Sequence, residues 1–96
     1  MENRNPHQIA NDLLKIADYI GKLAERLNEL NTFYAMWWQT YRVDYKSDKS
    51  AEKAYDLTKD GMEMQTIKLK IKVLERKMSA YKVYLRVLEG EARNQF

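Results

Sequence analysis

Large apolar residues recur along this chain at alternating spacings of four and three, in two separate runs. Such spacing averages 3.5 residues, the period of a coiled-coil seam rather than of the broader apolar face of a lone globular helix. The first run is Ile9, Leu13, Ile16, Ile20, Leu23, Leu27, Leu30, Tyr34, Trp37 and Tyr41. The second run is Ile67, Ile71, Leu74, Met78, Tyr81, Leu85, Leu88 and Ala92. Two seams in so short a chain predict an all-α fold, a long antiparallel helical hairpin resembling a coiled coil.

The ends of the two helices follow from cap and turn residues. Asn5 suits an N-cap, and Pro6 suits the first helical position because its missing N–H has no partner there. Turn-forming residues cluster between the two runs only from Lys46 to Ser50. We therefore expect one helical domain over residues 1–96, with a helix at about 6–46, a turn at 47–50 and a second helix at about 51–93.

Gly61 permits two interpretations of the second helix. Glycine often adopts the left-handed conformation just beyond a helix end, so a break near Gly61 is one interpretation. Leu57 and Met64 nevertheless carry the heptad pattern backwards across Gly61, and we favour one continuous helix. An antiparallel register centred on the predicted turn then places Leu27 beside Leu74.

The second helix carries more apolar side chains than one seam uses. A helix that is apolar on two sides contacts more than one neighbour, and a two-helix core this small gains from self-association. We expect a homo-oligomer, with a third helix formed by the N-terminal arm as the alternative. The expected interface residues are Leu69, Val73, Ala80, Val83, Tyr84 and Val87. Ala10, Ala17 and Ala24 lie beside the first seam, where small side chains let a neighbouring helix approach closely.

Basic side chains concentrate in the second helix. Residues 1–63 carry nine basic and eleven acidic side chains, whereas residues 64–88 carry seven basic side chains against Glu75 alone. The seven are Lys68, Lys70, Lys72, Arg76, Lys77, Lys82 and Arg86. Their spacing predicts a basic stripe along one edge, and such a stripe can follow a phosphate backbone.

The alternative for these cations is an ordinary solvated face. Lysines beside a seam commonly balance acidic residues of the neighbouring helix, and Asp18, Glu25 and Glu29 of the first helix are available for that role. The near absence of acidic residues over 64–88 favours a polyanion as the partner.

Aromatic residues gather near the end of the first helix. Tyr34, Trp37 and Tyr41 belong to the seam and are assigned to the core. Phe33, Trp38 and Tyr45 lie off the seam, with Arg42 beside them. These four form either a subunit contact, since aromatic residues and arginine anchor interfaces, or a surface on which unpaired bases stack.

The inventory of catalytic residues argues against an enzyme. His7 is the one histidine, and no acidic or sulfur ligand stands at metal-ligand spacing from it. There is no cysteine and no glycine-rich phosphate loop. We expect no catalytic residues, no metal and no cofactor. No segment is long and apolar enough to span a membrane and the first residues lack a signal-peptide core, so we expect a cytoplasmic protein without a membrane partner.

Three segments carry a resemblance to a known group of proteins. They are Tyr41-Arg42-Val43-Asp44-Tyr45, Lys49-Ser50-Ala51-Glu52-Lys53, and Leu85-Arg86-Val87-Leu88-Glu89-Gly90-Glu91-Ala92-Arg93. Together they resemble small helical-hairpin proteins from the recombination and early gene blocks of tailed phages. More distantly, the chain is similar to the recombination mediators of T4-like phages, helical ring-formers that bind single-stranded DNA. This resemblance spans residues 33–93, although the chain is shorter than those mediators.

The resemblance and the basic helix together predict a non-enzymatic accessory protein of phage-type recombination or replication. It would self-associate and bind single-stranded DNA or RNA through the seven basic side chains, in the host cytoplasm if the chain is phage-encoded. The alternative is a small helical adaptor or inhibitor that binds a host or phage protein, such as a defence or replication factor.

Overall fold

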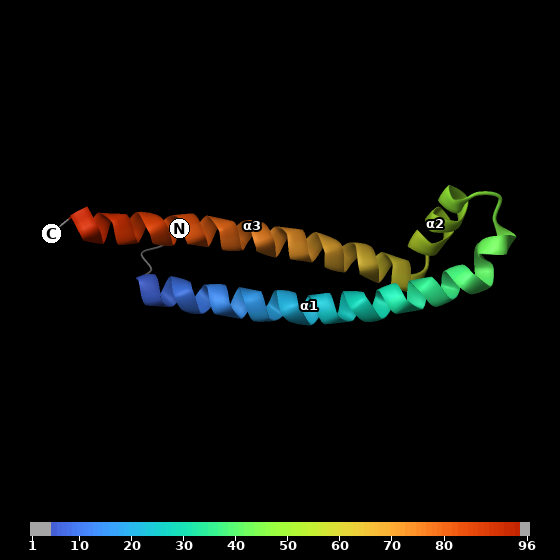
Figure 1. Ribbon diagram of the computed structural model, residues 1–96, viewed down its shortest axis with the longest axis horizontal. Coiled ribbons are helices and arrows are strands. Elements are labelled where there is room, and N and C mark those ends of the chain that lie inside the picture. Colours follow the sequence, from blue (N-terminus) through green and yellow to red (C-terminus); the bar gives the residue numbers. More distant parts are fainter. Residues whose placement is uncertain (1–4, 95–96) are drawn as a thin grey trace.

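The computed structural model describes residues 5–94, with residues 91–94 described by their backbone alone. The elements are α1 (Pro6–Tyr41), the 3₁₀ helix η1 (Arg42–Asp44), α2 (Asp48–Asp56) and α3 (Lys59–Asn94). No strand occurs between residues 5 and 94, which confirms the all-α prediction. The molecule measures 69 × 20 × 18 Å, and α1 and α3 run side by side in opposite directions with α2 at one end (Figure 1). The Ala92 side chain, last in the second run, lies outside the described part.

Both predicted features of the first helix start are present. The Asn5 side chain accepts a hydrogen bond from the Gln8 backbone N–H at 2.9 Å, and the Gln8 side chain accepts one from the Asn5 N–H at 3.0 Å. This reciprocal pair is a capping box, which satisfies two helix-end donors. Pro6 occupies the first turn, as predicted.

The first helix is shorter than predicted. We expected it to extend to about residue 46, but α1 ends at Tyr41 and the chain tightens into η1. The Arg42 guanidinium donates to an Asp48 carboxylate oxygen at 2.6 Å and to the Tyr45 carbonyl oxygen at 2.8 Å. Both acceptors lie beyond the helix end, so these bonds stabilise a bend at the point where the seam pattern also stops.

The predicted turn at 47–50 is displaced by a few residues. Ser47 caps α2, because its hydroxyl accepts a hydrogen bond from the Ser50 N–H at 3.1 Å, and α2 already includes residues 48–50. The non-helical residues are therefore 45–47, immediately after η1. Asp48 stands in the first turn of α2, where its negative charge interacts favourably with the helix dipole and stabilises the helix.

The preferred continuous second helix is wrong: Leu57 and Thr58 separate α2 from α3. The Thr58 hydroxyl donates to the Tyr55 carbonyl oxygen at 2.6 Å and accepts from the Gly61 N–H at 3.0 Å. One side chain thus satisfies an end of each helix. The alternative, a break near Gly61, is confirmed, but its proposed cause is wrong. Gly61 lies within the first turn of α3, and no glycine between residues 5 and 94 has a positive φ.

Gly61 is required by a close approach of the two helices. A Cβ atom at Gly61 would lie 2.0 Å from the Tyr55 carbonyl oxygen and 2.8 Å from the Asp56 Cα. Both are backbone atoms of α2 and cannot rotate away. The absence of a side chain at Gly61 therefore lets α3 begin directly beneath the end of α2.

The register between α1 and α3 differs from the predicted one. The predicted register sets Arg26 opposite residue 75, yet Arg26 binds Glu63 through two hydrogen bonds of 2.6 and 3.0 Å. A slip of one heptad, about seven residues, presents the same seam positions to each other. Leu27 and Leu30 share one core cluster with Met64 and Ile67, as a slip of one heptad would give, whereas Glu63 lies 12 residues before the predicted partner of Arg26. Helix α2 packs beside the end of α1 through Tyr55, so α3 begins further back along α1.

The best-packed part of the core lies where α1, α2 and α3 meet. Leu30 is fully buried, and Tyr55 of α2 is 3% exposed. The Tyr55 ring packs against Tyr34 and Trp37 of α1, with ring centroids 4.4 and 5.2 Å apart. Its hydroxyl lies 3.4 Å from the Met64 sulfur of α3. Tyr55 therefore contacts side chains of both α1 and α3. Burial raises the pKa of the Tyr55 hydroxyl above its usual value.

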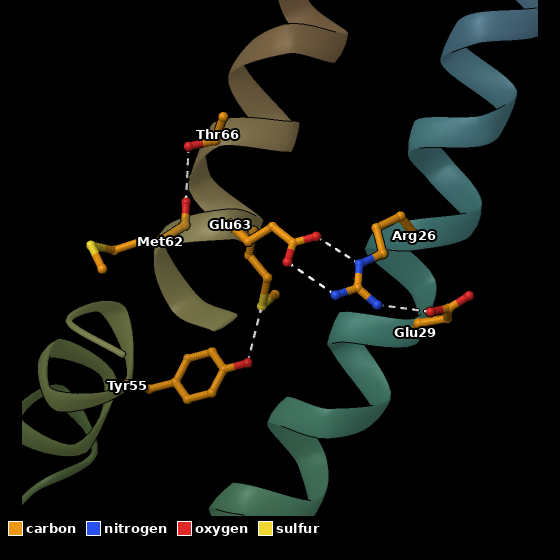
Figure 2. A network of polar contacts seen from close by, with 7 residues as sticks. Arg26, Glu29, Tyr55, Met62, Glu63 and Thr66 are labelled. Carbon is orange, nitrogen blue, oxygen red and sulfur yellow. Dashed lines mark hydrogen bonds and ion pairs between the residues drawn. The ribbon is translucent and has the colours of Figure 1, made fainter. Parts of the chain in front are cut away.

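A bidentate ion pair links α1 to α3 beside this cluster. Figure 2 shows the Arg26 guanidinium facing the Glu63 carboxylate across the two helices, with Glu29 on its other side. The Arg26 Nη1 atom lies 2.9 Å from the Glu29 Oε2 atom. Hydrogen bonds from Arg26 hold the pKa of Glu63 below its usual value. This two-pronged geometry is the strong form of an arginine–carboxylate contact.

This ion pair predicts a loss of stability in acid. The stabilisation is complete above the pKa of Glu63 in the unfolded chain and disappears as the pH falls through the lower pKa of the folded state. Melting temperatures of the wild type and Glu63→Gln should therefore differ at neutral pH and converge well below about pH 4. Glu25→Gln, at an exposed site on α1, serves as the matched control. A constant difference between wild type and Glu63→Gln across the whole pH range would contradict this role.

Candidate nucleic-acid interface

The seven predicted basic residues all lie on α3 with exposed side chains. Helix α3 runs without interruption through them, because the residues between Lys68 and Arg86 include no proline or glycine. Helix α3, which carries all seven, runs along one side of the molecule beside α1 (Figure 1). The fold thus presents all seven cations to solvent.

Acidic side chains of α1 do not neutralise these cations. Asp18 pairs with Lys22 at 3.4 Å, and Glu29 pairs with Arg26, so both acidic groups are used within α1. Within residues 5–94, none of the seven cations forms an ion pair. Lys77 makes a cation–π contact, with its Nζ 5.9 Å from the Tyr81 ring centroid. These contacts disfavour the interpretation of the cations as partners of acidic residues on α1.

The seven cations do not form a single edge, so this part of the prediction is wrong. Residues two apart on an α-helix point roughly 160° away from each other, and Lys70 and Lys72 therefore occupy opposite sides of α3. Lys72 and Arg76 line an open depression of about 480 Å³ together with Glu75 and Ser79. Lys70 instead borders a depression of about 330 Å³ that contains Tyr19 of α1. The positive charge covers much of the solvent-facing surface of α3.

Most of the predicted interface residues are exposed on α3, although Leu69 and Val73 line the depression that also contains Tyr19 of α1. Leu69 is 64% exposed, Val83 is 59% exposed and Val73 is 54% exposed. Val87 and Ala80 are exposed as well, whereas Tyr84 is half-buried. Five of the six predicted residues are thus exposed, which leaves apolar surface on α3 available for a partner.

The aromatic group at the end of α1 is mostly occupied by contacts within the chain. The Arg42 guanidinium lies 5.8 Å from the Trp38 ring centroid while it binds Asp48. Trp38 is half-buried and packs on Tyr34, with ring centroids 5.7 Å apart. Among the four predicted residues, Arg42 therefore has a structural role in the loop.

Two of the remaining aromatic residues differ in exposure. Tyr45 is half-buried, with its ring centroid 5.9 Å from that of Trp37. Phe33 is 44% exposed. Tyr41 is 48% exposed, so its assignment to the core from its seam position is wrong.

Sequence reasoning missed two residues that position this surface. Thr58 stands directly before α3 and so sets which residues of α3 face solvent. The sequence signal for this helix start was a Thr followed two residues later by Asp60. Glu63 fixes the register through Arg26. No local sequence signal identifies such a contact between residues far apart in the chain.

The described residues hold no other recognisable chemical site. Between residues 5 and 94 no group of His, Asp or Glu side chains is arranged to hold a metal ion. No helix in this part is long and apolar enough to cross a bilayer. No family model matches the chain, and neither the curated proteins nor the solved structures contain a match to it.

Proposed function

We propose that this protein is a non-enzymatic accessory factor of phage-type recombination or replication, an antiparallel helical hairpin that self-associates and binds single-stranded nucleic acid. One observation supports it most: the seven cations of α3 are exposed and form no ion pair within residues 5–94. The resemblance of residues 33–93 to phage recombination mediators points to the same function and to the host cytoplasm.

The proposed binding is electrostatic. Each phosphate that a lysine or arginine neutralises releases condensed counterions, so affinity falls as salt rises. Because the cations lie on several sides of α3, a flexible strand suits them better than a straight duplex. Exposed rings on α1 add a reason for a single strand: Phe33 and Tyr41 are 44% and 48% exposed, and unpaired bases stack on such rings.

A paired set of variants tests the location of this site. Lys72→Gln/Arg86→Gln removes two cations from α3, and Lys49→Gln/Lys53→Gln removes two exposed cations from α2. Fluorescence anisotropy with a labelled single-stranded oligonucleotide at low salt should show at least about tenfold weaker binding for the α3 variant, since two phosphate contacts are lost. The α2 variant should bind like the wild type.

Two results would reject the proposed function. One is the absence of any binding to single-stranded DNA or RNA at low salt. The other is an equal loss of affinity in the α3 and α2 variants, because net charge rather than the α3 surface would then explain binding.

The second candidate function is docking on another protein. The α2 end of the molecule exposes several large apolar side chains, including Val43 at 85%, Leu57 at 79% and Met36 at 61%. Exposed apolar clusters of this kind occur at protein interfaces. Retained nucleic-acid binding by Leu57→Ser, with loss of a captured host or phage protein, would assign this second function to the α2 end.

A further inference from the structure

The exposed apolar side chains of α3 repeat the spacing of a coiled-coil seam. They and Arg76 stand at alternating distances of four and three residues and are here called the α3 stripe: Leu69, Val73, Arg76, Ala80, Val83 and Val87. All six are exposed. A seam that is not used within the chain is suited to a helix from another chain.

The size of the α3 stripe fits a specific interface. Burying one Val or Leu side chain removes roughly 60–120 Å² of apolar surface, and four such side chains here are at least half exposed. With Ala80 and the Arg76 stem, the stripe offers on the order of 200–350 Å² of apolar surface. A standard interface buries about 800 Å² per partner, of which a little over half is apolar. The stripe therefore supplies roughly half or more of that apolar part.

A second copy cannot readily cover this stripe with its own α3 stripe. Lys70 and Lys77 flank the stripe on one side, and Lys72 and Arg86 flank it on the other. Two α3 stripes in contact would bring cations against cations along their length. Like charges set against each other at an interface are strongly unfavourable.

Helix α1 carries a face with the complementary properties. Small or apolar residues follow one another there at spacings of four and three and are here called the α1 stripe: Ala10, Leu14, Ala17, Gly21 and Ala24. All five are exposed, and a Cβ atom at Gly21 would meet nothing within 4 Å, so there is open space above the helix. Glu25 lies along one edge of this stripe, and its carboxylate complements the cations of α3. Asp18 lies on the same edge but pairs with Lys22 of its own helix.

From this complementarity we propose that the α3 stripe of one copy docks on the α1 stripe of the next copy. The proposal rests on the self-association in the proposed function and names the surface that receives α3. The two surfaces are different, so the contact is heterologous and repeats from copy to copy. Bulky side chains of α3 enter a row of small residues, and Leu14, 69% exposed, becomes covered.

Two single variants, measured alone and mixed, test this pairing. Val83→Asp disables the α3 stripe, and Ala17→Arg disables the α1 stripe. Both positions are exposed, so the helix content measured by circular dichroism should match that of the wild type. By light scattering, wild type should form oligomers and each variant alone should be a monomer. An equimolar mixture should form 1:1 dimers, because each variant retains the surface that the other has lost. Gln39→Arg, exposed on α1 outside the stripe, should assemble like the wild type.

Three results would overturn the proposal. Wild-type assembly by Ala17→Arg would show that α3 pairs with something other than the α1 stripe. Failure of the mixture to form dimers would also show that the α3 stripe does not pair with the α1 stripe. A wild type that stays monomeric at high concentration would remove both the pairing and the self-association. Nucleic-acid binding is measured separately by anisotropy, so its failure is distinguished from that of the pairing.

Discussion

Replacement of Tyr55 by alanine should lower the free energy of unfolding by about 4 kcal/mol, the usual cost of removing a buried aromatic side chain. Tyr55 is 3% exposed and packs against Tyr34 and Trp37 of α1. Without its ring, α2 loses its main attachment to α1 and to Met64 of α3. Urea denaturation, followed by circular dichroism, measures the change.

Two further variants separate the ring of Tyr55 from its hydroxyl and from its helix. Tyr55→Phe removes only the weak contact with the Met64 sulfur and should cost less than about 1 kcal/mol. Leu57→Ala changes a side chain that is 79% exposed near the same helix end and should have a similarly small effect. If Tyr55→Ala costs no more than Leu57→Ala, α2 does not pack on α1 as described.

Replacement of Gly61 by alanine should destabilise the fold by about 3 kcal/mol, the upper part of the range for forcing extra atoms into packed structure. The added Cβ meets the Tyr55 carbonyl oxygen at 2.0 Å, and the α2–α3 junction has to open to admit it. On an ordinary exposed helix the same change is favourable, because alanine has a higher helix propensity than glycine.

Gly21→Ala provides the matched comparison on α1. A Cβ atom there meets nothing within 4 Å, so the variant should be stabilised by about 1 kcal/mol. Thermal denaturation of the two variants should therefore shift the melting temperature in opposite directions. Stabilisation by Gly61→Ala would show that α2 and α3 form one continuous helix, as the heptad pattern alone had indicated.

The sequence predicts the helical class and the start of α1 because both depend on local information. Seam spacing identifies the helices, and Asn5 with Pro6 identifies where the first one begins. The register is different, because heptad seams shifted by seven residues match equally well. The choice between registers depends on Arg26 and Glu63, which are 37 residues apart, and on the space taken by α2.

The break between α2 and α3 could not be predicted from the heptad pattern alone either. Leu57 and Met64 keep the seam spacing across it, yet Leu57 is 79% exposed and contributes nothing to the core. Thr58 ends one helix and begins the next through a single hydroxyl. Its helix-start pattern was present in the sequence but competed with a longer apolar pattern.

For the candidate site, the sequence correctly predicts which cations are exposed but not how they are arranged. Exposure follows from seam positions, since residues outside the seam face solvent. The opposite placement of Lys70 and Lys72 follows from helix geometry. The use of Arg42 in the loop depends on Asp48 and the Tyr45 carbonyl, which a helical pattern through residue 46 could not place.

The salt dependence of single-strand binding tests the proposed role of the α3 cations most directly. A plot of log affinity against log salt concentration should be a straight line. Its downward slope should be about 0.7 for each phosphate neutralised on a single strand. The slope for Lys72→Gln/Arg86→Gln should be shallower than that of the wild type by about 1.4, and the slope for Lys49→Gln/Lys53→Gln should be unchanged. A wild-type affinity that does not change with salt, or equal slopes for all three proteins, would contradict the proposal.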